Sequence, residues 1–152
     1  FNEENNEEAG EHFTPRDVVR LMANLVFWPI ADHIQSATYR VYDGACGTGG
    51  MLTVAEDTLR DLANSRGKDV SIHLFGQEVN PETYAISKAD LLLKGEGAGA
   101  ENMKFGSTLS RDAFPSGEFD FMLSNPPYGK SWEMDLERMG GKKDMAGHRF
   151  IV

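Results

Sequence analysis

Apolar residues recur along the chain at two different spacings, and their alternation predicts strands that are followed by helices. Four short apolar runs have the length of strands, and between them apolar residues recur every three or four positions, as in helices. The strands are expected at residues 39–43, 72–76, 103–105 and 119–123, and the helices at residues 14–28, 50–66 and 80–93. This order of elements predicts an α/β fold with a parallel sheet.

Two of the expected helices begin with residues that favour a helix start. In the first helix, Thr14 is the expected cap, Pro15 the first helical residue, and Asp17 favours the positive end of the helix dipole. In the third helix, Asn80 and Pro81 take the roles of cap and first residue. The apolar residues that recur at helical spacing in the first helix are Val18, Leu21, Met22, Leu25 and Val26.

Other segments lack such a pattern. Residues 1–11 are expected to form a polar, mobile lead-in, and residues 12–152 a single domain. Residues 95–100 are small and predict a turn, and residues 129–147 predict a long, mobile loop. Residues 148–152 resemble the beginning of another strand, so the sheet is expected to be incomplete.

The 152-residue chain has a globular composition, with 40% hydrophobic residues and a net charge of −9. No apolar run approaches the ~20 residues of a membrane-spanning helix. The single cysteine, Cys46, excludes an intramolecular disulfide and a cysteine-based zinc site, and favours a reducing, cytoplasmic location. The four histidines lack the spacing of metal ligands, so no metal is expected. The acidic charge argues against nucleic-acid binding by this chain alone, which usually requires a basic surface.

A glycine-rich run, Gly44 to Gly50, directly follows Asp43 at the end of the first strand and precedes a helix. Glycines let the backbone approach a ligand, and a helix N-terminus offers unpaired N–H groups. A dinucleotide fingerprint fails at Leu52, and a phosphate loop fails because Gly50-Met51 replace its lysine and hydroxyl residue. Two interpretations remain. One is S-adenosylmethionine, whose ammonium and ribose suit the carboxylates of Asp43 and Glu78, and the other is a turn needed only for packing.

The tetrapeptide Asn125-Pro126-Pro127-Tyr128 follows the last strand and is the most specific motif. Its prolines fix the backbone and remove two N–H groups, which leaves carbonyl oxygens as acceptors. The Asn125 amide oxygen and the Pro126 carbonyl can accept both hydrogens of one amino group. Tyr128 offers a flat surface for a base that has left the stack. The alternative is a rigid turn with a core tyrosine.

Together these motifs resemble the modification subunit of type I restriction–modification systems, within the DNA adenine-N6 methyltransferase family. The resemblance covers most of residues 11–152, although Gly44 stands where the usual form of the first cofactor motif has proline. The matching segments are Glu11-His12-Phe13-Thr14-Pro15-Arg16, the run from Asp43 to Leu52, the run from Phe75 to Asn80, the run from Lys88 to Gly95, the tetrapeptide, and the run from Gly129 to Trp132.

The resemblance implies a Rossmann-like methyltransferase fold with strand order 3-2-1-4, of which residues 12–152 form the N-terminal part of the catalytic domain. It implies the cofactor S-adenosyl-L-methionine and catalysis by Asn125, Pro126, Pro127 and Tyr128. The cofactor-binding residues that it implies are Glu11, His12, Phe13, Thr14, Pro15, Arg16, Asp43, Gly44, Ala45, Gly47, Thr48, Gly49, Gly50, Glu78, Ser107, Thr108 and Asn125. Family members often carry Asp or Asn at the position of Ser107, near the adenine amino group of the cofactor.

The implied reaction is methyl transfer to N6 of an adenine that is flipped out of duplex DNA. The implied partners are duplex DNA, a DNA-specificity subunit, a restriction subunit and a second modification subunit, with no membrane. A separate specificity subunit would explain the acidic charge of this chain. Two alternatives remain, because the tetrapeptide recognises an amino group and not the molecule that carries it. They are methylation of an RNA base or a protein glutamine, and a non-catalytic cofactor-binding scaffold.

Overall fold

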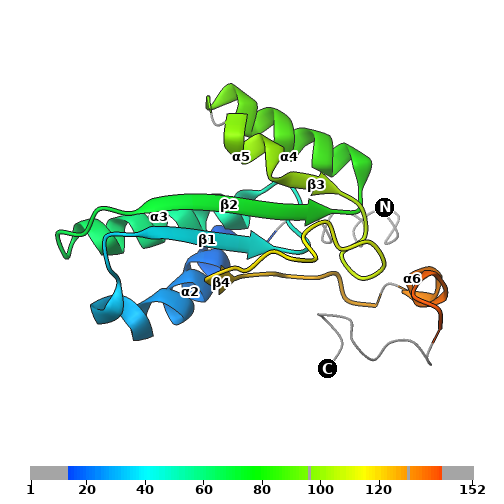
Figure 1. Ribbon diagram of the computed structural model, residues 1–152, viewed down its shortest axis with the longest axis horizontal. Coiled ribbons are helices and arrows are strands. Elements are labelled where there is room, and N and C mark those ends of the chain that lie inside the picture. Colours follow the sequence, from blue (N-terminus) through cyan, green and yellow to red (C-terminus); the bar gives the residue numbers. More distant parts are fainter. Residues whose placement is uncertain (1–13, 96, 130, 142–152) are drawn as a thin grey trace, which may run out of the picture.

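A four-stranded parallel sheet forms the centre of the molecule (Figure 1). The computed structural model describes residues 14–95, 97–129 and 131–141. The strands are β1 (Thr38–Asp43), β2 (Ser71–Glu78), β3 (Met103–Phe105) and β4 (Phe121–Met122). Their order in the sheet is β3-β2-β1-β4. The predicted parallel α/β fold and the strand order 3-2-1-4 are therefore confirmed.

Helices precede, connect and follow the strands. They are α2 (Arg16–Phe27), the 3-10 helix η1 (Trp28–His33), α3 (Gly50–Asn64), α4 (Pro81–Leu93), α5 (Gly97–Glu101) and α6 (Glu133–Arg138). The predicted cap of α4 is confirmed, because the Asn80 side chain accepts hydrogen bonds from the backbone N–H groups of Glu82 (2.9 Å) and Thr83 (3.1 Å). Among the described residues, no helix is long and apolar enough to cross a membrane.

The main core lies between one face of the sheet and helices α2, α3 and α4. In the parallel register Val41 pairs with Leu74, and Gly76 pairs with Met103, so these residues share the face that the helices cover. The buried face of α3 includes the predicted residues Leu52, Ala55, Leu59 and Leu62. Burial of such a side chain contributes about 1.5–3 kcal/mol, so this layer anchors the strands that carry the candidate site.

The opposite face of β1 and β2 carries an aromatic cluster. Tyr42 pairs with Phe75 in the register, and the segment between β3 and β4 places Phe114 and Phe119 against them. The rings of Tyr42 and Phe119 stack with centroids 4.5 Å apart and an interplanar angle of 11°. This packing holds the long connection from β3 to β4 against the sheet.

Helix α2 agrees only in part with the face that its spacing predicted, because of the five predicted residues only Met22 and Val26 pack against the core. Its buried residues are Val19, Ala23 and Phe27, whereas Val18, Leu21 and Leu25 are exposed. The predicted cap is also wrong, because Pro15 occupies the cap position and no side chain caps the helix. The Pro15 carbonyl accepts the first helical hydrogen bond, from the Val19 N–H at 3.1 Å. The acidic residue in the first turn is Asp17, as expected.

Three segments differ from the prediction for local reasons. The turn expected at residues 95–100 contains helix α5, and the loop expected at residues 129–147 contains helix α6. Both are short helices whose sequences carry little apolar periodicity, which is the pattern that would have revealed them. Strand β4 pairs over two residues rather than five. The lead-in at residues 1–11 and the strand expected at 148–152 lie outside the described residues.

Candidate active site

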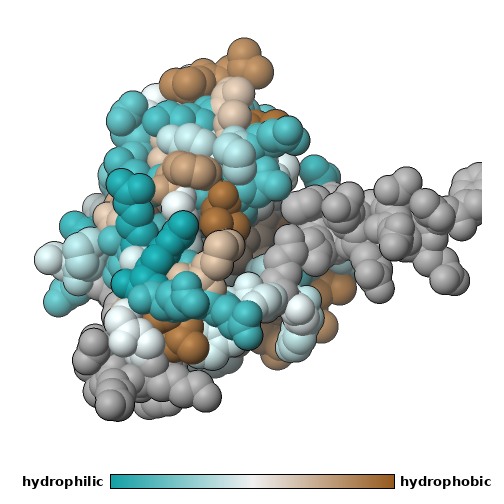
Figure 2. All heavy atoms as spheres, turned by 90° about the vertical axis from the view of Figure 1, so that its right-hand side faces the viewer, coloured by the Kyte–Doolittle hydropathy of each residue, from teal (hydrophilic) through white to brown (hydrophobic). Residues whose placement is uncertain are grey.

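The three predicted motifs meet at the edge of the sheet where the parallel strands end (Figure 1). Strand β1 ends at Asp43, β2 ends at Glu78, and the tetrapeptide follows β4, the neighbour of β1 on its other side. Strands β2 and β3 are added on one side of β1 and β4 on the other, so the order of the strands reverses at β1, and open α/β sheets bind ligands at such a switch point. Figure 2 looks onto this edge, where hydrophilic side chains cover much of the visible surface.

The glycine run forms a tight loop between β1 and α3. Gly49 has a φ of 85°, a left-handed conformation that favours glycine, and its N–H donates to the Cys46 carbonyl at 2.8 Å. The Cys46 N–H donates to the carbonyl of Gln77 in β2 at 3.1 Å, which ties the loop to the neighbouring strand. Helix α3 begins at Gly50, so its first N–H groups lie beside the loop.

The Glu78 carboxylate bridges two parts of this edge. Its Oε2 accepts from the Gly47 N–H at 2.9 Å, and its Oε1 accepts from the Asn80 N–H at 2.7 Å. Each carboxylate oxygen can accept more than one hydrogen bond. Glu78 therefore holds the glycine loop in place and still has acceptor capacity for a ligand hydroxyl.

Asp43 is a buried carboxyl group at the end of β1, with 1% of its surface exposed. The pKa of Asp43 is raised to about 6, mainly by burial and to a smaller extent by the nearby Glu78 carboxylate. Hydrogen bonds from the Ala45 N–H and the Ser124 side chain lower the pKa and partly oppose this shift. Among the described residues, neither Asp43 nor Glu78 takes part in an ion pair. A cation placed at this edge would therefore find acidic partners.

The segment after β3 is fixed to the same edge by Gln77, a residue that sequence reasoning did not single out. Its side chain is fully buried. The Nε2 group donates to the carbonyls of Gly106 (3.2 Å) and Arg111 (2.8 Å), and Oε1 accepts from the Ala113 N–H at 3.1 Å. These partners lie 29 to 36 residues away in sequence, so no local pattern reveals them.

Two predicted cofactor residues lie in this segment. The Ser107 hydroxyl accepts from the Leu109 N–H at 3.3 Å, and the Thr108 hydroxyl donates to the Gly44 carbonyl. A Cβ atom at position 44 would approach the Thr108 Cγ2 at 3.1 Å and the Tyr42 hydroxyl at 3.2 Å. The structure therefore brings the segment after β3 against the glycine loop, and the close approach explains why glycine suits position 44.

The tetrapeptide after β4 is exposed throughout, and 94% of the surface of Tyr128 is accessible. Tyr128 is therefore not the core residue of the structural alternative. The Asn125 Nδ2 group donates to the Thr14 hydroxyl at 3.0 Å, which joins the tetrapeptide to the residues just before α2. The described part of the motif expected at residues 11–16 thus lies beside the tetrapeptide.

The remaining predicted residues lie at the start of α2, in the glycine loop, or outside the described residues. Pro15 and Arg16 are exposed at the start of α2, Thr48 is exposed in the glycine loop, and Glu11, His12 and Phe13 lie outside the described residues. Burial raises the pKa of the Cys46 thiol, with a further contribution from Asp43 and Glu78, which disfavours the thiolate that a nucleophile needs. The described residues contain no group of His, Cys, Asp and Glu suited to a metal ion.

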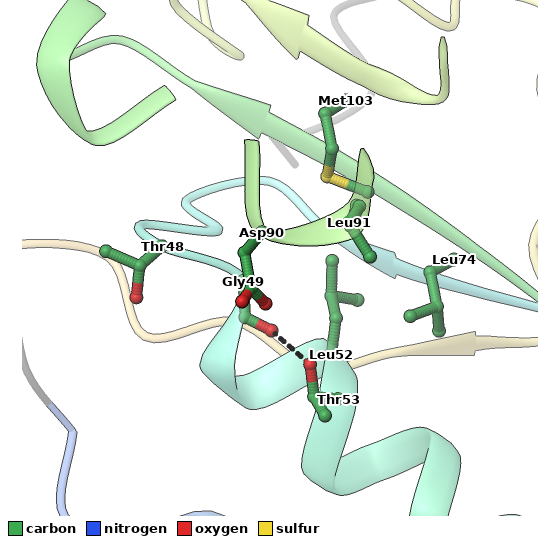
Figure 3. A pocket seen from close by; sticks show the side chains of 8 residues that line it. All are labelled: Thr48, Gly49, Leu52, Thr53, Leu74, Asp90, Leu91 and Met103. Carbon is green, nitrogen blue, oxygen red and sulfur yellow. Dashed lines mark hydrogen bonds between the residues drawn. The ribbon is translucent and has the colours of Figure 1, made fainter. Parts of the chain in front are cut away.

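A hollow lies behind the glycine loop, between α3 and α4 (Figure 3). Leu52, Leu74, Leu91 and Met103 line its apolar part, and the Thr53 hydroxyl donates to the Gly49 carbonyl at 3.3 Å. Its volume of about 10 Å³ is far below the roughly 300–1,000 Å³ of ligand pockets. This hollow belongs to the packing that supports the loop.

The fold is that of S-adenosylmethionine-dependent methyltransferases. A putative class I member from Listeria monocytogenes superposes with a TM-score of 0.53 at 19% identity, over 84% of this chain and 36% of that one. The model of the N-6 DNA methylase family matches residues 1–148. The chain therefore belongs to the N-6 DNA methylase family.

Within this family, the proteins similar to this chain in sequence and structure include methylase subunits of type I restriction–modification systems. The methylase subunit of the type I restriction enzyme MjaVII from Methanocaldococcus jannaschii is 33% identical over 128 residues, covering 84% of this chain and 19% of the relative. The crystal structure of the type I methyltransferase subunit from Streptococcus thermophilus is 28% identical with a TM-score of 0.64, over 86% of this chain and 26% of that one. The chain thus spans about a quarter or less of the length of these proteins.

Proposed function

We propose that this chain is the N-terminal part of the catalytic domain of a DNA adenine-N6 methyltransferase, which acts as the modification subunit of a type I restriction–modification complex. The observation that carries the proposal is the meeting of two kinds of site at one sheet edge. The glycine loop and the carboxylates of Asp43 and Glu78, together the acidic loop site, lie where β1 and β2 end, and the exposed tetrapeptide, the proposed site of the amino group, follows β4. Membership of the N-6 DNA methylase family supports the same reaction.

The acidic loop site fits S-adenosylmethionine. The carboxylates of Asp43 and Glu78 stand beside a loop of backbone N–H groups, and among the described residues neither is neutralised by an ion pair. We assign the ribose hydroxyls to Glu78 and the ammonium group to the acidic edge that includes Asp43. When bound, this cofactor supplies an electrophilic methyl group on a positively charged sulfur.

The tetrapeptide prepares the amino group that receives the methyl group. Asn125 Oδ1 and the Pro126 carbonyl accept its two hydrogens, which draws the nitrogen lone pair away from ring conjugation. Tyr128 exposes 94% of its surface and can stack on the flipped base, a contact worth roughly 1–3 kcal/mol. The nitrogen lone pair forms a bond to the methyl carbon as the carbon–sulfur bond breaks with its electron pair remaining on sulfur, and the nitrogen then releases a proton to water. The residues therefore contribute mainly alignment, and no covalent enzyme intermediate is required.

DNA, a DNA-specificity subunit, a restriction subunit and a second modification subunit are the proposed partners. The net charge of −9 fits such a division of labour, because the basic surface for phosphate contacts would come from another subunit. The relatives that the chain resembles are methylase subunits of restriction enzymes, which supports an assembled complex.

The test is label transfer from methyl-labelled S-adenosylmethionine by the full-length protein assembled with its specificity subunit. Unmethylated duplex DNA, bulk RNA and the protein fraction are offered in separate reactions. The proposal predicts label in duplex DNA, recovered as N6-methyladenine after digestion to nucleosides. Label in RNA or protein would replace the proposed substrate, and cofactor binding without any transfer would indicate a scaffold.

A further inference from the structure

The hydrogen bond between Asn125 and Thr14 joins two segments that are 111 residues apart in sequence. Sequence reasoning assigned Thr14 to the cofactor. In the structure its hydroxyl accepts from the Asn125 Nδ2 group at 3.0 Å, and Thr14 is only partly exposed. Thr14 therefore contacts the residue that the proposed function gives to the methyl acceptor.

An amide side chain has one accepting and one donating end, and only the accepting end suits an amino group. If Nδ2 faced the target nitrogen, two N–H donors would oppose each other and the productive hydrogen bond would be lost. A partner that accepts from Nδ2 points Oδ1 in the opposite direction. In the structure the Thr14 hydroxyl oxygen accepts from Nδ2 and therefore leaves Oδ1 pointing away from Thr14.

The exposure of Asn125 makes such a partner important. An exposed amide rotates between staggered wells, and its terminal torsion is broad, so it rarely adopts one orientation unless a hydrogen bond selects it. Among the described residues, the structure gives the Asn125 side chain one hydrogen bond, to Thr14. Thr14 lies directly before Pro15, whose ring restricts the preceding backbone, so the hydroxyl is presented from a stiff segment.

The geometry points to Thr14 as a positioning residue for methyl transfer: its hydroxyl holds Asn125 Nδ2, so that Asn125 Oδ1 faces the target amino group. This inference rests on the proposed function of Asn125 and deepens it. It separates Thr14 from the donor site, because a residue that orients the acceptor changes the rate of transfer and not the affinity for the cofactor.

The experiment compares Thr14→Val with Thr14→Ser in the full-length protein assembled with its specificity subunit. Valine keeps the branched shape and removes the hydroxyl, whereas serine keeps the hydroxyl and removes a methyl group. Thr38→Val is the matched control, because Thr38 is exposed at the opposite end of β1 from the site. For each variant, single-turnover label transfer to DNA is measured at saturating S-adenosylmethionine, and cofactor affinity is measured by calorimetry.

We expect Thr14→Val to slow transfer roughly five- to tenfold, the effect of one lost hydrogen bond, with cofactor affinity unchanged. Thr14→Ser and Thr38→Val should both stay within about twofold of the wild-type rate. A loss of cofactor affinity with normal transfer at saturation would return Thr14 to the donor site and overturn the inference. Equal rates for the valine and serine variants would also overturn it.

A parallel measurement on Asn125→Ala separates this inference from the proposed function. If Asn125→Ala loses transfer while Thr14→Val does not, the proposed function stands and the positioning role is wrong. If Asn125→Ala keeps transfer, the assignment of Asn125 fails, and the role of Thr14 fails with it.

Discussion

The proposed donor region, Asp43 with the glycine loop and Glu78, and the proposed acceptor region, the tetrapeptide at residues 125–128, are built in opposite ways. Asp43 is 1% exposed and the glycine loop is held by hydrogen bonds to Glu78 and Gln77, whereas Tyr128 is 94% exposed. A small cofactor that is bound in each cycle suits a pre-formed site with fixed acceptors. A base that arrives from DNA needs an open surface, and its binding energy can come from stacking when it arrives. The two regions should therefore respond differently to substitution.

The largest expected effect is on methyl transfer in the acceptor region. Asn125→Ala removes one of the two proposed acceptors of the target amino group, and loss of such a preorganised group costs roughly 100-fold or more. Cofactor affinity should stay within about threefold, because Asn125 contacts Thr14 and not the glycine loop. Single-turnover label transfer and calorimetry measure the two quantities. Near-normal transfer would remove Asn125 from the mechanism.

The next effect is on stability in the donor region. Gln77→Leu leaves two carbonyls and one N–H without their buried partner, which should lower the free energy of unfolding by at least about 3 kcal/mol. Denaturant unfolding of the full-length protein measures this change. Gln35→Leu is the control, because Gln35 is exposed and lies just before the start of β1, at the opposite end of the strand from the site. If the two variants were equally stable, Gln77 would not support the loop.

Glu78→Ala tests the cofactor contact itself. It removes the acceptor of the Gly47 and Asn80 N–H groups and the proposed acceptor of the ribose hydroxyls. Cofactor affinity should fall by about 1–3 kcal/mol, roughly 5- to 150-fold. The exposed Glu82 at the start of α4 provides a matched control, Glu82→Ala, which should bind normally. Unchanged affinity of Glu78→Ala would refute the assignment of Glu78.

Tyr128 distinguishes stacking from hydrogen bonding in the acceptor region. Tyr128→Ala removes the ring and should weaken DNA-dependent transfer by roughly 1–3 kcal/mol. Tyr128→Phe keeps the ring and should cost much less. Because Tyr128 is exposed, neither variant should change the free energy of unfolding by more than about 0.5 kcal/mol. Equal transfer by the two variants would argue against stacking.

The smallest effect is a pH dependence of cofactor binding. The pKa of Asp43 is raised to about 6, so below pH 6 the carboxyl group holds a proton that it must release to face a cationic ammonium group. Affinity should therefore fall as pH decreases through 6, approaching about tenfold, or 1.4 kcal/mol, per pH unit. Calorimetry across this range tests it. Asp43→Asn should bind more weakly and lose the pH dependence, and a pH-independent wild type would separate Asp43 from the ammonium group.

Local sequence patterns predicted much of the fold, and the Asn80 cap and the buried face of α3 agree with the structure. The strand order, which the family resemblance implied, agrees as well. Helix α2 shows the limit, because it carries apolar residues on more than one face and only the sheet decides that Phe27 is buried while Leu25 is exposed. Helix α6 shows another limit of prediction from sequence, since a short polar helix has no apolar periodicity to detect.

The candidate site shows the same division. The motifs placed Asp43, the glycine loop and Glu78 at the ends of predicted parallel strands, and the sheet brings these strand ends to one edge. The roles of Gln77 and Thr14 could not be predicted, because each depends on partners far away in the sequence. Side-chain hydrogen bonds over such separations are set by tertiary packing and leave no local pattern.

We propose that the methyl-donor and methyl-acceptor functions lie in separate regions of one sheet edge. The most direct test measures cofactor affinity and single-turnover DNA methylation in parallel for Asn125→Ala and Glu78→Ala. We predict that Asn125→Ala loses transfer with cofactor affinity retained, and that Glu78→Ala loses affinity but recovers transfer as the cofactor approaches saturation. If both variants lost affinity and saturated transfer together, the separation of the two regions would be contradicted.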